Sequence, residues 1–275
     1  MTTSQPMTRA RGPLAPRGER PPRAGALSAS MTFGWRALLK IKHSPNQLVD
    51  ALMLPVIFTL SFTYLVGGAI AGSPGRYLHF FLPGVMVMAV ALTTAYTGIV
   101  LNQDVDQGVF DRVRSLPVWQ SSVLVGAMLG DVVRYAVASV VPLLLGLALG
   151  FRPDGGLAGV VLALLFLQVF AFSLAWIGTF VGVSVRTPTA AQTLSWTLLF
   201  ILVVASNVMV PQQTMPGWLE ALIKVNPISV VTTAMRGLMD GTVTAGQMGW
   251  AFLACAVLVA VFAPLTMYRY GRARH

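Results

Sequence analysis

Charged residues are scarce in this 275-residue chain: they make up 10% of it, whereas soluble domains carry about 25%. Hydrophobic residues reach 55%. This composition excludes a water-soluble globular fold, because no soluble core hides so much apolar surface. Lipid covers such surface when the backbone is helical, so the composition predicts an all-α integral membrane protein.

Cysteine and histidine are equally scarce. Cys255 is the single cysteine, which excludes an intrachain disulfide, and the three histidines form no ligand cluster. The chain also lacks the phosphate-binding G-x-x-x-x-G-K-[ST] and the catalytic patterns H-E-x-x-H and G-x-S-x-G. We therefore expect no bound metal or cofactor, no ATP hydrolysis by this chain and no enzymatic activity.

The net charge of +10 comes mostly from the two ends of the chain. Eight of the 19 basic residues precede the first apolar run and three more close the sequence. Cations placed this way flank membrane spans and orient them, so we do not expect nucleic-acid binding.

Apolar runs long enough to cross about 30 Å of hydrocarbon recur along the chain. We expect six transmembrane helices, at residues 51–71, 80–101, 132–150, 157–183, 190–210 and 248–268. With both termini in the cytoplasm, 15 of the 19 basic residues lie on the inner side. The positive-inside rule therefore predicts a multi-pass protein with both termini in the cytoplasm. Arginine outnumbers lysine 16 to 3, which is typical of a GC-rich bacterial genome, so we expect the bacterial inner membrane.

Three regions follow from these runs. Residues 1–30 are rich in Pro, Arg, Gly and Ser, which predicts a disordered basic cytoplasmic tail. Residues 31–49, with Trp35 and Arg36, separate an apolar from a cationic face, which is typical of an interfacial amphipathic helix. A plain basic flank before the first span is the alternative. Residues 50–270 form the transmembrane domain.

The inner connection after the second span is long and charged. Val109, Phe110 and Val113 fall at helical spacing, which predicts a short amphipathic helix over residues 106–116 that ends before Pro117. This helix is either a solvated turn or a docking element for another protein, with Phe110 as its apolar anchor and Arg112 as a polar contact.

The outer connection, residues 211–246, contains a second unusual stretch. The apolar run 218–225 is too short to span, so we expect it to enter the outer leaflet and return as a re-entrant segment. Two pairs at helical spacing, Glu220 with Lys224 and Arg236 with Asp240, are expected to form ion pairs.

Polar groups inside the spans are few. Asp131 and Arg134 share a helical face, and their pairing serves either as a structural anchor or in energy coupling. Gly178 and Gly182 allow close helix packing, first within the chain. A polar and aromatic trail on spans two and five suits an amphiphilic substrate, with ordinary helix packing as the alternative. Its residues are Phe81, Met88, Thr93, Tyr96, Gln192, Trp196, Leu199, Val203 and Asn207.

Three separated motifs resemble the permeases of the ABC-2 type, in particular their daunorubicin-resistance branch. They are SPNQLVDALMLPVIFTLSFTYLVGGAI in the first span, GVFDRVRSLPVWQSSVLVGAMLGDVVR in the inner connection, and MPGWLEALIKVNPISVVTTAMRGLMDG in the outer one. They occur in the family's order and lie within residues 35–268.

The resemblance implies the membrane half of an exporter. A separate ABC ATP-binding subunit, with ATP and Mg, supplies the energy, and a second or related permease completes the assembly. It also implies that the inner connection and the interfacial helix contact the ATPase, that the substrate path follows spans two and five between two protomers, and that the outer segment caps it. The implied coupling residues are Gly108, Phe110, Asp111, Arg112, Arg114, Pro117, Trp35 and Arg36, and the implied outer gate residues are Met215, Trp218, Asn226 and Pro227.

The expected function is therefore ATP-driven export of an amphiphilic drug-like compound or lipid by alternating access. Export of a polysaccharide or glycolipid by the same machinery is the first alternative. An ion-coupled transporter without an ATPase is the second, and it is disfavoured because the spans hold almost no acids or histidines for a proton relay.

Overall fold

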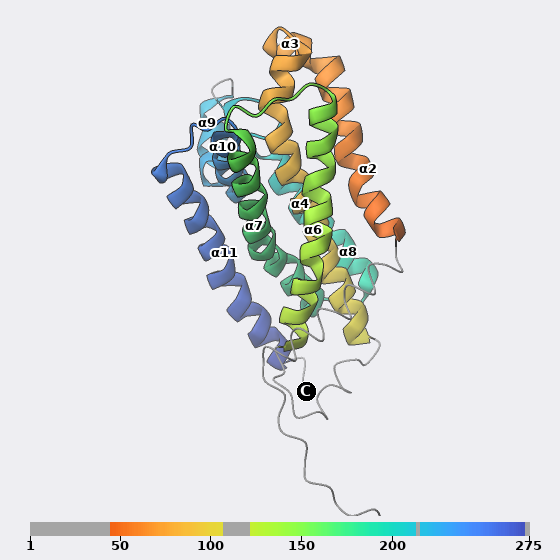
Figure 1. The fold of residues 1–275 in the computed structure, drawn as a ribbon. Helices are drawn as coiled ribbons and strands as arrows, with labels where there is room; N and C mark the ends of the chain where they lie inside the picture. The colour runs from red at the N-terminus through yellow and green to blue at the C-terminus, as the bar shows by residue number, and fades with distance from the viewer. Residues whose placement is uncertain (1–44, 107–121, 213–214, 273–275) are drawn as a thin grey trace, which may run out of the picture.

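The structure, a computed structural model, describes residues 45–106, 122–212 and 215–272, and every element in these ranges is a helix. They form an elongated bundle (Figure 1). The elements are α2 (Pro45–Ser61), the π-helical turn η1 (Phe62–Val66), α3 (Gly67–Ala71), α4 (Pro74–Asp106), α6 (Ser122–Ala148), α7 (Gly156–Ser184), α8 (Pro188–Val204), α9 (Gly217–Val225), α10 (Pro227–Met239) and α11 (Ala245–Arg272).

Five of the expected spans are confirmed as helices long and apolar enough to cross a bilayer: residues 53–71, 74–103, 131–148, 156–184 and 245–269. The first is helical throughout but passes through the π-helical turn η1, and it ends at Gly72, whose φ of 75° requires a residue without a β-carbon. The predictions 80–101, 157–183 and 248–268 were too narrow by one to six residues at each end, whereas 51–71 began two residues too early and 132–150 ended two residues too late.

Helix α8 differs from its predicted span. It ends at Val204, six residues before the expected end, because Ala205–Val210 leaves the helical conformation. Its 17 residues rise about 26 Å at 1.5 Å per residue, slightly less than the hydrocarbon thickness. The described chain therefore has five long apolar helices and a sixth, shorter one.

Helix α4 is the centre of the bundle and packs against α6, α7, α8 and α10. Its closest approach is to α7, where a β-carbon on Gly98 would overlap the backbone of Gly178, and one on Gly182 would overlap the carbonyl of Gly98. The Gly178–Gly182 pair thus mediates packing within the chain, as predicted.

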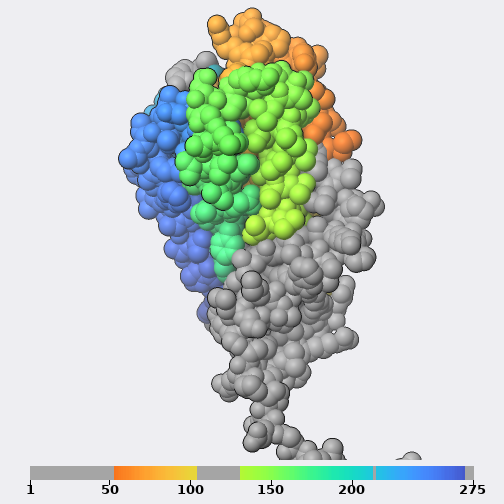
Figure 2. Space-filling model, in the orientation of Figure 1, coloured from red at the N-terminus to blue at the C-terminus, as the bar shows by residue number. Residues whose placement is uncertain are grey.

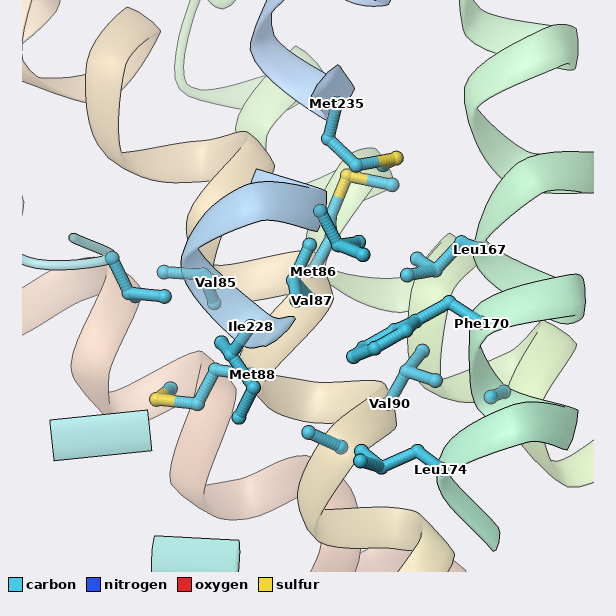
Figure 3. Close-up of a cluster of buried hydrophobic side chains, with 14 of the residues drawn as sticks. Val85, Met86, Val87, Met88, Val90, Leu167, Phe170, Leu174, Ile228 and Met235 are labelled. Carbon is cyan, nitrogen blue, oxygen red and sulfur yellow. The ribbon is translucent and has the colours of Figure 1, made fainter. Parts of the chain in front are cut away.

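The hydrophobic core surrounds α4 near the middle of the bundle. Figure 3 shows Met86, Val87 and Val90 of this helix beside Leu167, Phe170 and Leu174 of α7, with Ile228 and Met235 approaching from α10. Because α10 supplies buried core side chains, this helix is an integral part of the bundle and not part of a surface loop.

The ends of the bundle are distinct. Helices α3, α9 and α10 lie at the end away from the C-terminus (Figure 1). Helices α11, α7 and α6 lie side by side on one face of the molecule (Figure 2). Many apolar side chains of α11 are exposed, among them Phe252, Leu253, Val257 and Val261, as expected of a helix surrounded by lipid.

Candidate functional site

The predicted coupling residues lie outside the described part of the chain: Gly108, Phe110, Asp111, Arg112, Arg114, Pro117, Trp35 and Arg36. Their role stays a prediction. Helices α4 and α6, which end and begin on either side of residues 107–121, are described, and they carry a buried polar cluster.

This cluster joins α4 to α6. Asp131 and Arg134 form an ion pair of 2.9 Å, with side chains only 7% and 4% exposed. Thr97 on α4 donates to Asp131 Oδ2 at 2.6 Å and lies 2.7 Å from the Tyr135 hydroxyl. The predicted pairing is confirmed. Removing either partner of this buried ion pair would leave the other charge buried without a counter-ion, which is strongly destabilising.

The same cluster reaches α8 through two aromatic contacts. The guanidinium carbon of Arg134 lies 5.9 Å from the ring centroid of Tyr96, and the Tyr96 ring meets Trp196 edge-on at 6.2 Å. Two members of the predicted path, from spans two and five, are therefore in contact. The two contacts link the N-terminal half of α6, through Tyr96 of α4, to α8.

The other predicted path residues are distributed differently. Phe81, Met88, Thr93, Leu199 and Val203 are buried in the helix-packing core, where Thr93 donates to the Ala89 carbonyl of its own helix at 2.7 Å. Gln192 is exposed. Movement of cargo along these residues stays a prediction.

The C-terminal end of α8 is the most elaborate polar site in the described chain. A helix that ends inside a protein leaves carbonyl groups without partners. Asn226 provides the missing partners, because its amide nitrogen donates to Leu202 O and Ala205 O, each at 2.7 Å. Its Oδ1 accepts a hydrogen bond from the Ile228 backbone N–H at 2.9 Å. Asn226 is thus both the N-cap of α10 and the anchor of α8, and Pro227 takes the first position of α10.

The segment after α8 is tied down by further side chains. Asn207 makes two hydrogen bonds to α10: its Nδ2 donates to Thr233 Oγ1 at 3.0 Å, and its backbone N–H donates to Ser229 Oγ at 3.2 Å. Its Oδ1 accepts no hydrogen bond from any described residue. Tyr77 OH donates to Met209 O at 2.9 Å. Hydroxyl groups of α4 and α10 therefore replace the missing helical bonds.

Arg236 completes this arrangement from α10. Its Nε donates to Phe80 O at 2.9 Å, one of its terminal nitrogens donates to Asn207 O and Val208 O at 2.9 and 3.2 Å, and its guanidinium lies 3.7 Å above the Phe80 ring. The expected ion pair with Asp240 is not formed in the described structure, because these backbone carbonyls occupy the guanidinium instead. The Glu220–Lys224 pair is confirmed at 2.8 Å.

The remaining predicted gate residues are peripheral. Met215 is partly buried and Trp218 on α9 is 69% exposed. Asn226 carries a local signal in the sequence, since Asn followed by Pro is a pattern that begins helices. Tyr77 and Arg236 were not predicted as part of this site, because their partners are backbone carbonyls distant in the sequence.

Comparison with known proteins gives consistent results. The model of the ABC-2 type transporter family matches residues 29–239. The daunorubicin resistance ABC transporter permease protein DrrB1 of Streptomyces coeruleorubidus is 51% identical over 253 residues, which cover 92% of this chain and 89% of that protein. The doxorubicin resistance ABC transporter permease protein DrrB of Mycobacterium tuberculosis is 27% identical over 76% of the chain, and the probable permease DrrC of that organism is 24% identical over 80%.

Proposed function

Because the chain belongs to the ABC-2 type transporter family and is a permease subunit rather than an enzyme, we propose that it exports an amphiphilic drug or lipid from the cytoplasm or the inner leaflet. The observation that carries the proposal is its 51% identity, over nearly its whole length, to a permease named for daunorubicin resistance. ATP and Mg bind to a separate ABC ATP-binding subunit.

The proposed topology has six spans, with α8 as the fifth. Helix α8 supports this assignment because the non-helical residues that follow it lie against α4: a β-carbon on Gly84 would be 3.0 Å from Val208 O. Helices α9 and α10, of 9 and 13 residues, are too short to span, and α10 is buried against α4, α7 and α11. We propose that they form a re-entrant segment in the outer leaflet of a bacterial inner membrane. Both termini are then cytoplasmic.

The proposed mechanism is alternating access in a pair of permeases. Closure of the ATPases acts on residues 105–117 and on Trp35 and Arg36, and α4 and α8 rearrange in response. The Asp131–Arg134 pair supports this route, because it lies on α6 and reaches α8 through the Tyr96 and Trp196 rings. Asn226 and Pro227 position the outer gate at the far end of α8.

Co-purification with an ATP-binding subunit tests the proposal. The chain is expressed with the ABC ATPase encoded beside its gene, and ATP hydrolysis by the complex is compared for wild type, Phe110→Ala and Arg112→Ala. Arg76→Ala is the matched control, because Arg76 is exposed at the opposite end of α4. We expect a stable wild-type complex whose ATP hydrolysis or assembly is weakened by the first two changes and not by the third.

A different outcome would contradict the proposed partnership with an ATPase. A chain that binds no ATPase, yet moves substrate in response to an ion gradient, would be an ion-coupled transporter. The proposed partnership would then be wrong.

A further inference from the structure

A groove of about 610 Å³ lies between α9, α10 and α11. Its volume is within the range of about 300–1,000 Å³ that is typical of sites for drug-sized ligands. Its lining residues are Asn207, Gln212, Ile223, Lys224, Val225, Pro227, Ser229, Val230, Thr233, Gln247, Trp250, Leu253, Ala254, Val257 and Leu258.

One wall of this groove, which we call the α10–α11 groove, is apolar and faces outward. Trp250, Leu253 and Val257 of α11 are 67%, 49% and 52% exposed. They cover one side, and Val230 of α10 lines the other. Such a wall accepts the flat or extended apolar body of an amphiphile without desolvating any polar group.

The groove also contains a polar side chain whose hydrogen bonding is incomplete. Asn207 is 4% exposed and its Oδ1 has no hydrogen-bond partner among the described residues. A buried acceptor in this state is unfavourable. Oδ1 is itself enclosed, so a ligand hydroxyl or amine in the groove would form this hydrogen bond, and remove the cost, on rotation of the Asn207 side chain toward the groove. Gln212 and Gln247 add further amide groups to the lining.

Formal charge is balanced at the edge of the groove. Lys224 lies 2.8 Å from Glu220, and this hydrogen bond and the charge of Lys224 hold the pKa of Glu220 below its ordinary value. Glu220 is therefore ionised at neutral pH, and its carboxylate balances the charge of Lys224. The lining selects for hydrogen-bonding groups and not for a net charge.

From this geometry we infer that the α10–α11 groove binds the amphiphilic cargo on its way out, through its apolar body and a hydroxyl or amine donor. The inference rests on the proposed export function and adds to it a second site, separate from the predicted path on spans two and five. Asn207 is common to the two sites, because it is one of the residues of the predicted path and it also lines the groove.

The cargo suits the groove better than a lipid acyl chain does. An acyl chain matches the apolar wall but offers no donor to Asn207 and no partner for the amides of Gln212 and Gln247. A drug-like amphiphile supplies both an apolar face and polar groups in one compact molecule.

The test introduces a large side chain into the groove and compares it with the same change at a matched position outside the groove. Ala254 lines the groove, whereas Ala256 on the same helix is exposed and does not. Daunorubicin binding to the full chain in phosphatidylcholine nanodiscs is measured by drug fluorescence for wild type, Ala254→Phe and Ala256→Phe. ATP-driven daunorubicin uptake by vesicles containing the complete transporter is measured in parallel.

We expect Ala254→Phe to weaken daunorubicin binding about tenfold, because the added phenyl ring occupies part of the groove, and to reduce uptake. Ala256→Phe should leave both unchanged. Circular dichroism and co-purification with the ATPase check that both variants are folded. A second variant, Thr233→Val, alters the groove beside Asn207 with little change in volume and should weaken binding severalfold.

Three results would overturn the inference. One is wild-type binding and uptake in Ala254→Phe, and another is equal loss in Ala254→Phe and Ala256→Phe. The third is loss of a co-purifying phospholipid from Ala254→Phe, detected by mass spectrometry, while daunorubicin affinity is unchanged; the groove would then be a lipid site. Failure of the export proposal itself looks different, because the wild-type transporter would then take up no daunorubicin in response to ATP.

Discussion

Asn226 holds the open end of α8, since its amide nitrogen donates to the Leu202 carbonyl at 2.7 Å across a separation of 24 residues. The same side chain begins α10 by accepting from the Ile228 backbone. One residue therefore fixes both where α8 stops and where α10 begins.

Replacing Asn226 by Ala should destabilise the protein by about 2–4 kcal/mol, because an N-cap and two hydrogen bonds to partly buried backbone carbonyls are lost together. Thr187→Ala is the matched control. Thr187 caps α8 and is also followed by a proline, but it is exposed and its side chain makes only the capping bond in the described structure. Its loss should cost about 1 kcal/mol. Thermal unfolding in detergent measures both, and equal losses would contradict the anchoring role of Asn226.

Arg236→Lys should lower the free energy of unfolding almost as much as Arg236→Met does. A lysine ammonium cannot reproduce the planar guanidinium that reaches Phe80 O, Asn207 O and Val208 O together, so either change should cost more than about 2 kcal/mol. Arg152→Lys provides the comparison, because Arg152 also donates to carbonyls but is exposed. It should change stability by less than about 0.5 kcal/mol. Full stability in Arg236→Lys would show that charge alone suffices.

Gly182→Ala should loosen the contact between α4 and α7. The added methyl group would overlap the Gly98 carbonyl, so we expect destabilisation of about 1–3 kcal/mol. Gly249→Ala on α11 meets nothing within 4 Å and should be neutral or stabilising, by up to about 1 kcal/mol, because alanine favours helix. The pair is compared by thermal unfolding, and a neutral Gly182→Ala would mean that the two helices separate freely.

The Asp131–Arg134 pair should show strong coupling in a double-mutant cycle. Asp131→Asn leaves a buried guanidinium without its counter-ion and should cost about 3–5 kcal/mol, whereas the double change Asp131→Asn with Arg134→Met should recover part of that loss. If the pair also transmits movement, the stable double variant should hydrolyse ATP but export little. Additive losses of stability would show that the two groups do not act together.

The sequence predicted the helical fold well, because apolar run length is sufficient to identify spans in lipid. It also predicted the Asp131–Arg134 pair and the Gly178–Gly182 contact, which depend on spacing along one helix. The end of α8 was placed too late. Residues 205–210 are as apolar as the helix before them, and the helix stops there because Asn226, Arg236 and Tyr77 satisfy its backbone.

The candidate site was harder to predict for the same reason. Hydrogen bonds from side chains to backbone carbonyls leave no pattern in the residues that accept them. The contact between Tyr96 and Trp196 joins helices that are distant in the sequence, and the α10–α11 groove is formed by three helices together. Only the fold brings these residues to one place.

ATP-driven uptake of daunorubicin into inside-out membrane vesicles tests the central claim most directly. The vesicles contain this permease with its ATP-binding partner, and the comparison is with a non-hydrolysable ATP analogue and with a protonophore. The account predicts uptake that needs ATP hydrolysis, persists with the protonophore and disappears when either subunit is left out. Uptake that proceeds without ATP and stops when the proton gradient is removed would contradict it.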